Sequence, residues 1–221
     1  MVRKIVIFAA SKKSALKEEL EQREDKVDAI IAAAQKRFAV FGAEKTSMRE
    51  IADDLHMSKA SLYYYFPDKE SLYLAVLEKE QAEFIHEMSE IIRNISEPDR
   101  MLKEYAVRRL GYFSRLLNLS RLRLEAYSDL KPALRDTTRS FKEKETELVK
   151  EIFKAGIDKG IFAIEDISQT AILFLDLLKG LRASLISGRK MLVIDQSEFN
   201  TLLEKTRTFT DIFIKGISPD A

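Results

Sequence analysis

The segment 46–72 constrains the fold of this chain more than any other part, because it contains signals for two short helices, a turn and a third helix. Ser47 with Glu50 three residues later forms a capping box, a pattern that begins helices. Ser58 is a second N-cap residue, since its hydroxyl accepts hydrogen bonds from amides that have no partner inside the helix. Pro67 ends that helix, because proline lacks an amide proton and restricts the preceding residue. Two short helices joined by a tight turn predict a helix-turn-helix unit.

The same segment resembles the DNA-binding signature of TetR-family transcriptional regulators. In that signature a turn is followed by Ser-Lys-Gly/Ala-Thr/Ser-Leu-Tyr-x-Tyr-Phe, and residues 58–66 of this chain are Ser-Lys-Ala-Ser-Leu-Tyr-Tyr-Tyr-Phe. His56 stands in the turn where many members have Gly; we expect positive φ there, which His tolerates better than most residues. The resemblance implies an all-α fold with a three-helix head, a long connecting helix, and a helical domain for ligand binding and dimerisation.

We expect three parts along the chain: a basic N-terminal extension at 1–24, a helix-turn-helix DNA-binding domain at 25–72, and a helical ligand-binding and dimerisation domain at 73–221. The extension has several basic residues and no acidic one before Glu18. It either contacts DNA phosphates or a minor groove, or it is a solvated tail. The first head helix is predicted at 26–41, with Phe41 on its apolar side and Gly42 ending it in the left-handed conformation.

Few glycines and prolines and 46% hydrophobic residues favour helix through the rest of the chain. Helices are predicted at about 69–94, 98–117, 119–130, 132–159, 167–187 and 198–215. Pro132 suits a first helical turn, Asp166 caps the helix that follows it, and Ser197 is the expected N-cap of the last helix.

The composition excludes several kinds of chemistry. The chain has no Cys and only two His, which argues against disulfides, thiol catalysis and a His-based metal site. We therefore expect no enzyme activity, no cofactor and no metal, and a reducing cytoplasmic location. The apolar run at 5–10 is too short to span a membrane, so no membrane partner is expected. The net charge of +1 does not by itself suggest nucleic acid.

The predicted DNA-contacting residues lie at the start of the second motif helix and beside it. Small or polar residues there allow close approach to the groove, and the tyrosine hydroxyls can donate to phosphates. Lys69 begins the next helix and is expected to bind a phosphate, whereas Tyr65 is expected to face the core. The complete set is Ser47, Arg49, Ser58, Lys59, Ala60, Ser61, Tyr63, Tyr64 and Lys69.

A ligand pocket is the first hypothesis for aromatic residues of the second domain. Tyr105, Arg109 and Tyr112 share one helix face at i, i+4 and i+7, with Arg109 as the cation that fixes an acidic group. The alternative is ordinary core with an arginine whose stem lies along it. The predicted pocket comprises Tyr105, Arg109, Tyr112, Phe113, Tyr127, Phe141 and Phe174.

A dimer interface is predicted from the helix at 167–187, which is apolar over most of its circumference and so has to be covered on all sides. Together with the last helix it suits a four-helix interface between two copies. The alternative is a helix buried within one monomer. The predicted interface comprises Phe174, Leu178, Leu181, Leu185, Phe199, Leu203, Phe209 and Phe213.

The predicted function is a homodimeric, sequence-specific repressor that binds a palindromic double-stranded DNA operator and is released by a small, mostly apolar effector. The alternative is a DNA-binding protein without a small-molecule inducer, which uses a protein co-effector or acts architecturally.

Overall fold

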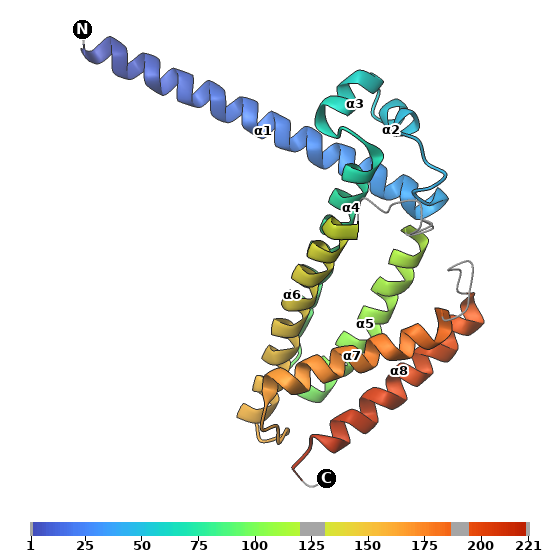
Figure 1. Cartoon of the computed structure of the whole chain (residues 1–221). Coiled ribbons are helices and arrows are strands. Elements are labelled where there is room, and N and C mark those ends of the chain that lie inside the picture. Colours follow the sequence, from blue (N-terminus) through green and yellow to red (C-terminus); the bar gives the residue numbers. More distant parts are fainter. Residues whose placement is uncertain (1, 120–130, 187–194, 220–221) are drawn as a thin grey trace. The chain divides into compact units, whose positions relative to one another are not determined.

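The computed structural model describes residues 2–119, 131–186 and 195–219, and all of their regular secondary structure is helical. Their side chains are described at 17–115, 132–183 and 195–219. The expected all-α class is confirmed for this part of the chain (Figure 1). The helices are α1 (Val2–Phe41), α2 (Met48–Asp54), α3 (Lys59–Tyr65), α4 (Lys69–Arg93), α5 (Pro98–Leu119), α6 (Lys131–Asp158), α7 (Ile167–Ile186) and α8 (Gln196–Gly216).

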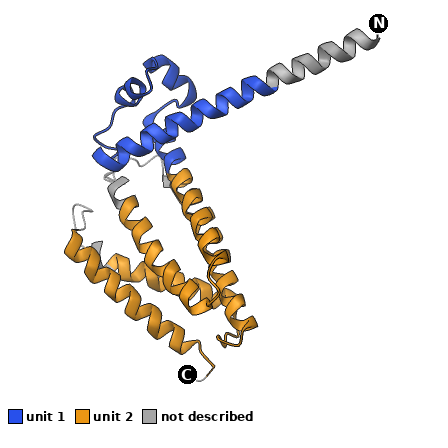
Figure 2. Cartoon of the chain, turned by 180° about the vertical axis from the view of Figure 1, so that it is seen from behind, with its two compact units in different colours: residues 1–76 blue, residues 77–221 orange. Residues whose placement is uncertain are grey.

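The chain divides into two compact units, Met1–Val76 and Leu77–Ala221 (Figure 2). The division falls inside α4, which is one continuous helix of 25 residues. The core of unit 1 forms where α1, α2 and α3 bury the apolar positions that their periodicity predicts. Its fully buried members include Ile30, Ala34, Phe38, Ile51 and Leu62.

The predicted caps and turns of unit 1 are confirmed. The Glu50 amide donates to Ser47 Oγ at 3.3 Å, and the Ser47 amide donates to Glu50 Oε2 at 2.8 Å. The Ser61 amide donates to Ser58 Oγ at 3.0 Å, which begins α3. His56 has φ 51° and Gly42 has φ 79°, so both occupy the left-handed region that the turns require. The helix-turn-helix geometry therefore comes from local signals.

Two expectations for unit 1 are corrected. The first helix does not begin near residue 26, because α1 is continuous from Val2 and no Gly or Pro precedes Gly42 to interrupt it. Phe41 is not a core residue, since 51% of it is exposed. Its ring lies 5.9 Å from the Arg37 guanidinium, at the last turn of α1, where the chain has left the core.

One expectation for unit 2 also changes. The N-cap of α8 is Asp195 rather than Ser197, because Asp195 forms a reciprocal capping box with Glu198. The predicted helix at 119–130 lies, apart from Leu119, outside the described residues, and so does Gly188, the expected end of the helix at 167–187. Asp166 does cap the helix that follows it, since its Oδ1 accepts from the Gln169 amide at 2.9 Å.

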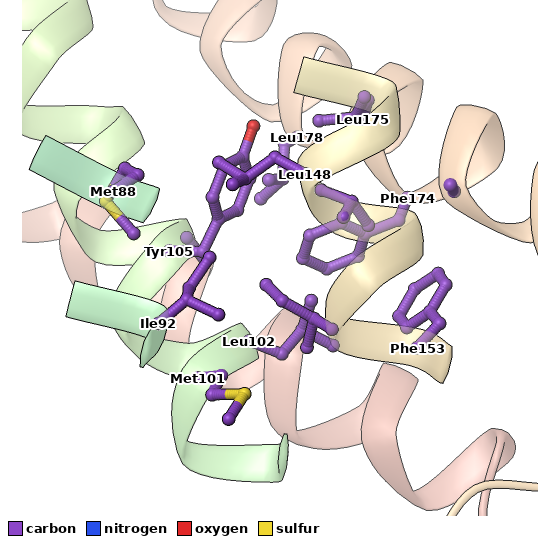
Figure 3. Packing of buried hydrophobic residues seen from close by; sticks show 14 of the residues in the cluster. Met88, Ile92, Met101, Leu102, Tyr105, Leu148, Phe153, Phe174, Leu175 and Leu178 are labelled. Atoms are coloured by element: carbon purple, nitrogen blue, oxygen red, sulfur yellow. The ribbon is translucent and has the colours of Figure 1, made fainter. Parts of the chain in front are cut away.

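The core of unit 2 is built from aromatic, aliphatic and methionine side chains of α4, α5, α6 and α7 (Figure 3). Tyr105 and Phe174 are fully buried with ring centroids 6.4 Å apart. Phe174 also lies 4.9 Å from the ring of Phe213 on α8. The contacts join α5, α7 and α8, so the inner face of α7 is fully occupied within one chain.

Candidate nucleic-acid interface

The recognition surface is the side of α3 that points away from the core of unit 1. Leu62 is fully buried and Phe66 is 8% exposed, and this pair anchors the helix. Tyr63 is 39% exposed and Tyr64 is 69% exposed, an unusual amount for tyrosine. The predicted residues Ser58, Lys59 and Ala60 are also exposed, and Ser61 is half-buried.

Cations lie beside the two exposed tyrosines. The Lys59 ammonium is 5.4 Å from the Tyr63 ring, and the Arg23 guanidinium of α1 is 5.9 Å from the Tyr64 ring. Tyr65 is half-buried and packs edge-on against Tyr64 at 5.1 Å. Such cation–aromatic contacts restrain side chains that would otherwise be mobile. Arg23 was not predicted, because its place beside α3 depends on how α1 packs.

The predicted α2 residues are accessible. Ser47 is exposed and engaged in its cap, and the Arg49 side chain is 80% exposed, 3.9 Å from Asp53. A surface pair of this kind contributes little stability, so Arg49 is available to other anions.

An arginine clamp fixes α2 against α1. Arg37 donates from Nε and Nη2 to the two carboxylate oxygens of Asp54 at 2.5 and 2.8 Å. The hydrogen bond from Arg37 lowers the pKa of Asp54 below its ordinary value. Hydrogen bonds from Ser47 likewise lower the pKa of Glu50, which lies 3.5 Å from Arg37. Sequence reasoning missed this clamp, since the partners are far apart along the chain.

Lys69 does not present a free ammonium, contrary to expectation. Its Nζ donates to the carbonyl oxygens of Ala43 at 2.9 Å, Thr46 at 3.1 Å and Glu44 at 3.4 Å. These carbonyls follow the end of α1, where backbone acceptors have no helical partners. Lys69 therefore ties the loop before α2 to the start of α4, and we correct its predicted role from phosphate contact to structural anchor.

The resulting surface is suited to a polyanion. Between Ser58 and Phe66 the sequence has an ammonium and several hydroxyls but no carboxylate. Hydroxyl and ammonium donors on a short helix are the groups that position proteins on phosphates, and the small Ala60 leaves room for base edges.

The predicted ligand residues of unit 2 form a buried polar network instead of an open wall. Arg109 donates from Nε and Nη2, along one edge of its guanidinium, to the two carboxylate oxygens of Glu145, and the Tyr105 hydroxyl donates to Glu145 Oε1 at 2.7 Å. Burial is the main cause that raises the pKa of Tyr105 well above its ordinary value, so it remains a donor. Burial is the largest influence and opposes the charge of Arg109, but Glu145, Tyr105 and Tyr112 together outweigh it, so the pKa of Arg109 is raised.

The predicted pocket residues do not line the open groove that the structure contains. Tyr105, Tyr112, Phe141 and Phe174 are buried in the core, Phe113 is half-buried, and Tyr127 lies outside the described residues. A groove of about 660 Å³ is instead lined by Ile85, Ser89, Arg139, Lys142, Glu143, Lys144, Thr146, Glu147, Leu148, Glu151 and Ile172. The aromatic rings of the predicted pocket residues pack against one another and fill the space that was predicted for a ligand.

The predicted dimer residues lie mostly toward the core. Phe174 and Leu178 are buried within unit 2, which corrects their assignment to a surface between copies. The half-buried members are Leu181, Phe199, Leu203, Phe209 and Phe213, and the side chain of Leu185 is outside the described residues. Among the described side chains, the large apolar ones that remain exposed on α7 and α8 are Ile172 (36%), Leu173 (53%), Leu177 (41%) and Ile212 (64%). Because α7 is apolar over most of its circumference, the sequence could not tell which side faces inward.

Comparisons with known proteins agree with this geometry. Residues 30–76 match the family described as "Bacterial regulatory proteins, tetR family". The chain is 48% identical over 52 residues to the HTH-type transcriptional regulator RutR of Escherichia coli K12, a match that spans 24% of each chain. A crystal structure of a transcriptional regulator from Cytophaga hutchinsonii is 41% identical, with a TM-score of 0.80 over 87% of this chain and 98% of that one.

A more distant structure shares the fold. A putative TetR-family transcriptional regulator from Mesorhizobium loti is 22% identical, with a TM-score of 0.70 over 89% of this chain and 98% of that chain.

Within the described ranges, every helix is too short or too polar to cross a bilayer.

Proposed function

Because the chain belongs to the TetR family of transcriptional regulators and carries that family's DNA-binding helix-turn-helix, we propose that it is a homodimeric repressor released from a palindromic operator by a small ligand. The observation that carries this proposal is the α3 surface, where exposed Tyr63, Tyr64 and Lys59 stand on a helix anchored by buried Leu62. That surface offers donors and no carboxylate.

In the proposed complex the start of α3 enters the major groove. Lys59 and Ser61 lie in its first turn, which meets base edges or phosphates in this motif. The hydroxyls of Tyr63 and Tyr64 donate to phosphate oxygens, and Arg23 beside Tyr64 adds a cation. Arg49 supplies a further cation from α2.

The proposed dimer forms through the exposed faces of α7 and α8. Leu173 and Leu177 lie one turn apart on α7, Gly180 follows on the same side, and Ile212 is exposed on α8. Large apolar side chains grouped on a surface mark protein contacts. A two-fold dimer presents its recognition helices to successive major grooves, about 34 Å apart, which accounts for a palindromic operator.

Release is proposed to act through α4. This helix begins at Lys69 in unit 1 and ends at Arg93 in unit 2, where Phe84 and Met88 are buried in the core. A ligand that binds unit 2 more tightly in the DNA-free geometry weakens DNA binding. Bound DNA in turn weakens ligand binding by the same factor. A typical coupling gives about 5- to 150-fold weaker operator binding.

The test is to select bound duplexes from a random pool and to measure affinity for the selected operator at several salt concentrations. Lys59→Ala is expected to reduce the slope of log affinity against log salt by about 1, since it removes a phosphate contact. Lys154→Ala, an exposed lysine of α6, is the matched control and should leave the slope unchanged. Equal affinity for the selected operator and random DNA would refute the proposal.

The second candidate is a DNA-binding protein without a small-molecule inducer. It is favoured by one observation: Tyr105, Tyr112, Phe141 and Phe174 fill the predicted pocket with their own rings. On this proposal a protein co-effector controls the regulator. Operator affinity that responds to a purified partner and to no small apolar molecule would decide in its favour.

A further inference from the structure

A single guanidinium holds both turns of α2. Arg37 on α1 donates from Nε and Nη2 to the two carboxylate oxygens of Asp54, the last residue of α2, at 2.5 and 2.8 Å. Its Nη1 lies 3.5 Å from a carboxylate oxygen of Glu50, which is in the first turn of that helix. Glu50 and Asp54 are four residues apart, so their side chains share one face of α2. Arg37 therefore fixes how that face is turned toward α1.

Apolar contacts alone do not set the rotation of α2. The helix has seven residues and buries Met48, Ile51 and Ala52. A helix of this length is not stable by itself, and apolar contacts are non-directional. Two parallel hydrogen bonds between a guanidinium and a carboxylate, in contrast, are directional and specify one geometry. The angle of α2 therefore depends on Arg37.

Arg37 is suited to this role because its own position is restrained. The next residue, Phe38, is fully buried in the core of unit 1, and 22% of the Arg37 side chain is exposed. The ring of Phe41, one turn further along α1, lies 5.9 Å from the guanidinium. Asp54 and Glu50 more than balance the charge of Arg37, so the cluster offers no net positive charge to a DNA phosphate. This separates Arg37 from the cations that are proposed to contact DNA.

The turn between α2 and α3 passes the orientation of α2 on to the recognition surface. The amides of Leu55 and Met57 both donate to the Ala52 carbonyl, at 3.1 and 3.0 Å, which ties the turn to the end of α2. The buried anchors of α3, Leu62 and Phe66, lie at the middle of the helix and just after its end. The N-terminal end of α3 is therefore positioned by the turn and, through the turn, by α2.

We infer that Arg37 is a positioning residue for DNA recognition: by holding both carboxylates of α2, it fixes the angle at which the start of α3 meets the bases. This role rests on the proposed sequence-specific function. Contacts to base edges need a closely defined geometry, whereas attraction to phosphates is independent of sequence and tolerates small rotations. Loss of the clamp therefore reduces discrimination between operator and random DNA more than it reduces non-specific binding.

The experiment measures the affinity of the full-length protein for two duplexes at several salt concentrations. One duplex is the sequence that the unmutated protein selects from a random pool, and the other is a random sequence. Arg37→Met should lower the ratio of the two affinities about 10- to 100-fold, roughly the loss of one base contact. Its salt slope should stay that of the unmutated protein, because no phosphate contact is lost. Lys36→Met, which removes an exposed cation from the same helix, is the matched control and should keep the ratio.

A second variant, Asp54→Asn, breaks the same clamp from the other side. It should lower the affinity ratio to a similar extent, and the double variant Arg37→Met, Asp54→Asn should lower it no further than either single change, because both remove one interaction. Circular dichroism establishes the melting transition of each variant, and affinities are measured below it. If Arg37→Met does not fold, Asp54→Asn decides the outcome.

Three results would overturn the positioning role of Arg37. The first is an unchanged affinity ratio in a folded variant, even one with a lower melting temperature, since Arg37 would then serve stability alone. The second is additive losses in the double variant, and the third is a salt slope reduced by about 1 in Arg37→Met, which would make Arg37 a phosphate contact. If the unmutated protein does not distinguish the two duplexes, the proposed function fails; if it does and the clamp variants do so equally well, only the role of Arg37 fails.

Discussion

Replacing Glu145 with Gln removes the carboxylate that pairs with Arg109 in the described part of the chain, while keeping nearly the same shape. Glu145 is 4% exposed and accepts from both Arg109 and Tyr105. A neutral amide there leaves two buried guanidinium groups, Arg109 and Arg182, in mutual repulsion. We therefore expect Glu145→Gln to destabilise unit 2 far more than an ordinary polar substitution does.

The expected size follows from the burial of the pair. Removing one partner of a buried ion pair typically costs about 3–5 kcal/mol, because the remaining charge is neither hydrated nor paired. For a domain of roughly 150 residues, each kcal/mol lowers the melting temperature by about 2–4 °C. Glu145→Gln should thus lower the melting temperature by about 6–20 °C.

The assay is urea and thermal unfolding of full-length protein, followed by circular dichroism. The matched control is Glu147→Gln on the same helix, where the carboxylate is 67% exposed and pairs with Lys150 at 2.8 Å; it should change stability by less than ~1 kcal/mol. The double variant Glu145→Gln, Arg109→Met should recover part of the loss, because it removes the cation left without a partner. A loss below ~1 kcal/mol for Glu145→Gln alone would refute the reasoning.

Two further predictions concern the head and the dimer. Lys69→Met should destabilise unit 1 by about 1–3 kcal/mol in urea unfolding, because the carbonyls that the ammonium binds lose a donor. The salt dependence of DNA binding should stay unchanged, and a reduced salt slope at unchanged stability would instead support a phosphate contact by Lys69. Leu177→Glu should dissociate the dimer in light scattering without unfolding the chain, because 41% of Leu177 is exposed within one monomer; an unchanged dimer mass would place the interface elsewhere.

Local signals in the sequence were sufficient for the helix-turn-helix. Ser47 with Glu50, Ser58, His56 and Gly42 act within a few residues of where they stand, so their hydrogen bonds and φ values could be predicted. The cap of α8 obeys the same rule, since Asp195 and Glu198 have capping-box spacing and outcompete Ser197.

Long-range partners could not be predicted in this way. The carbonyls that bind Lys69, the carboxylate that binds Arg37, and the ring beside Arg23 are set by tertiary packing. The same limit applies to Arg109. Its spacing from Tyr105 and Tyr112 correctly predicted a helix face shared with aromatic residues, but it could not predict that Glu145 pairs with Arg109. For α7, a helix that is apolar over most of its circumference gives too weak a signal to choose its inner face.

The hydrogen bonding of Lys69 also makes this residue a chemical reporter. An ammonium that donates to backbone carbonyls reacts with amine-directed reagents chiefly when the loop after α1 opens, whereas the exposed Lys59 reacts directly. The labelling rate of Lys69 relative to that of Lys59 therefore measures local opening of unit 1. Bound DNA that covers α3 would slow the labelling of Lys59 by blocking access to its ammonium. It would slow the labelling of Lys69 only to the extent that it suppresses opening of the loop after α1.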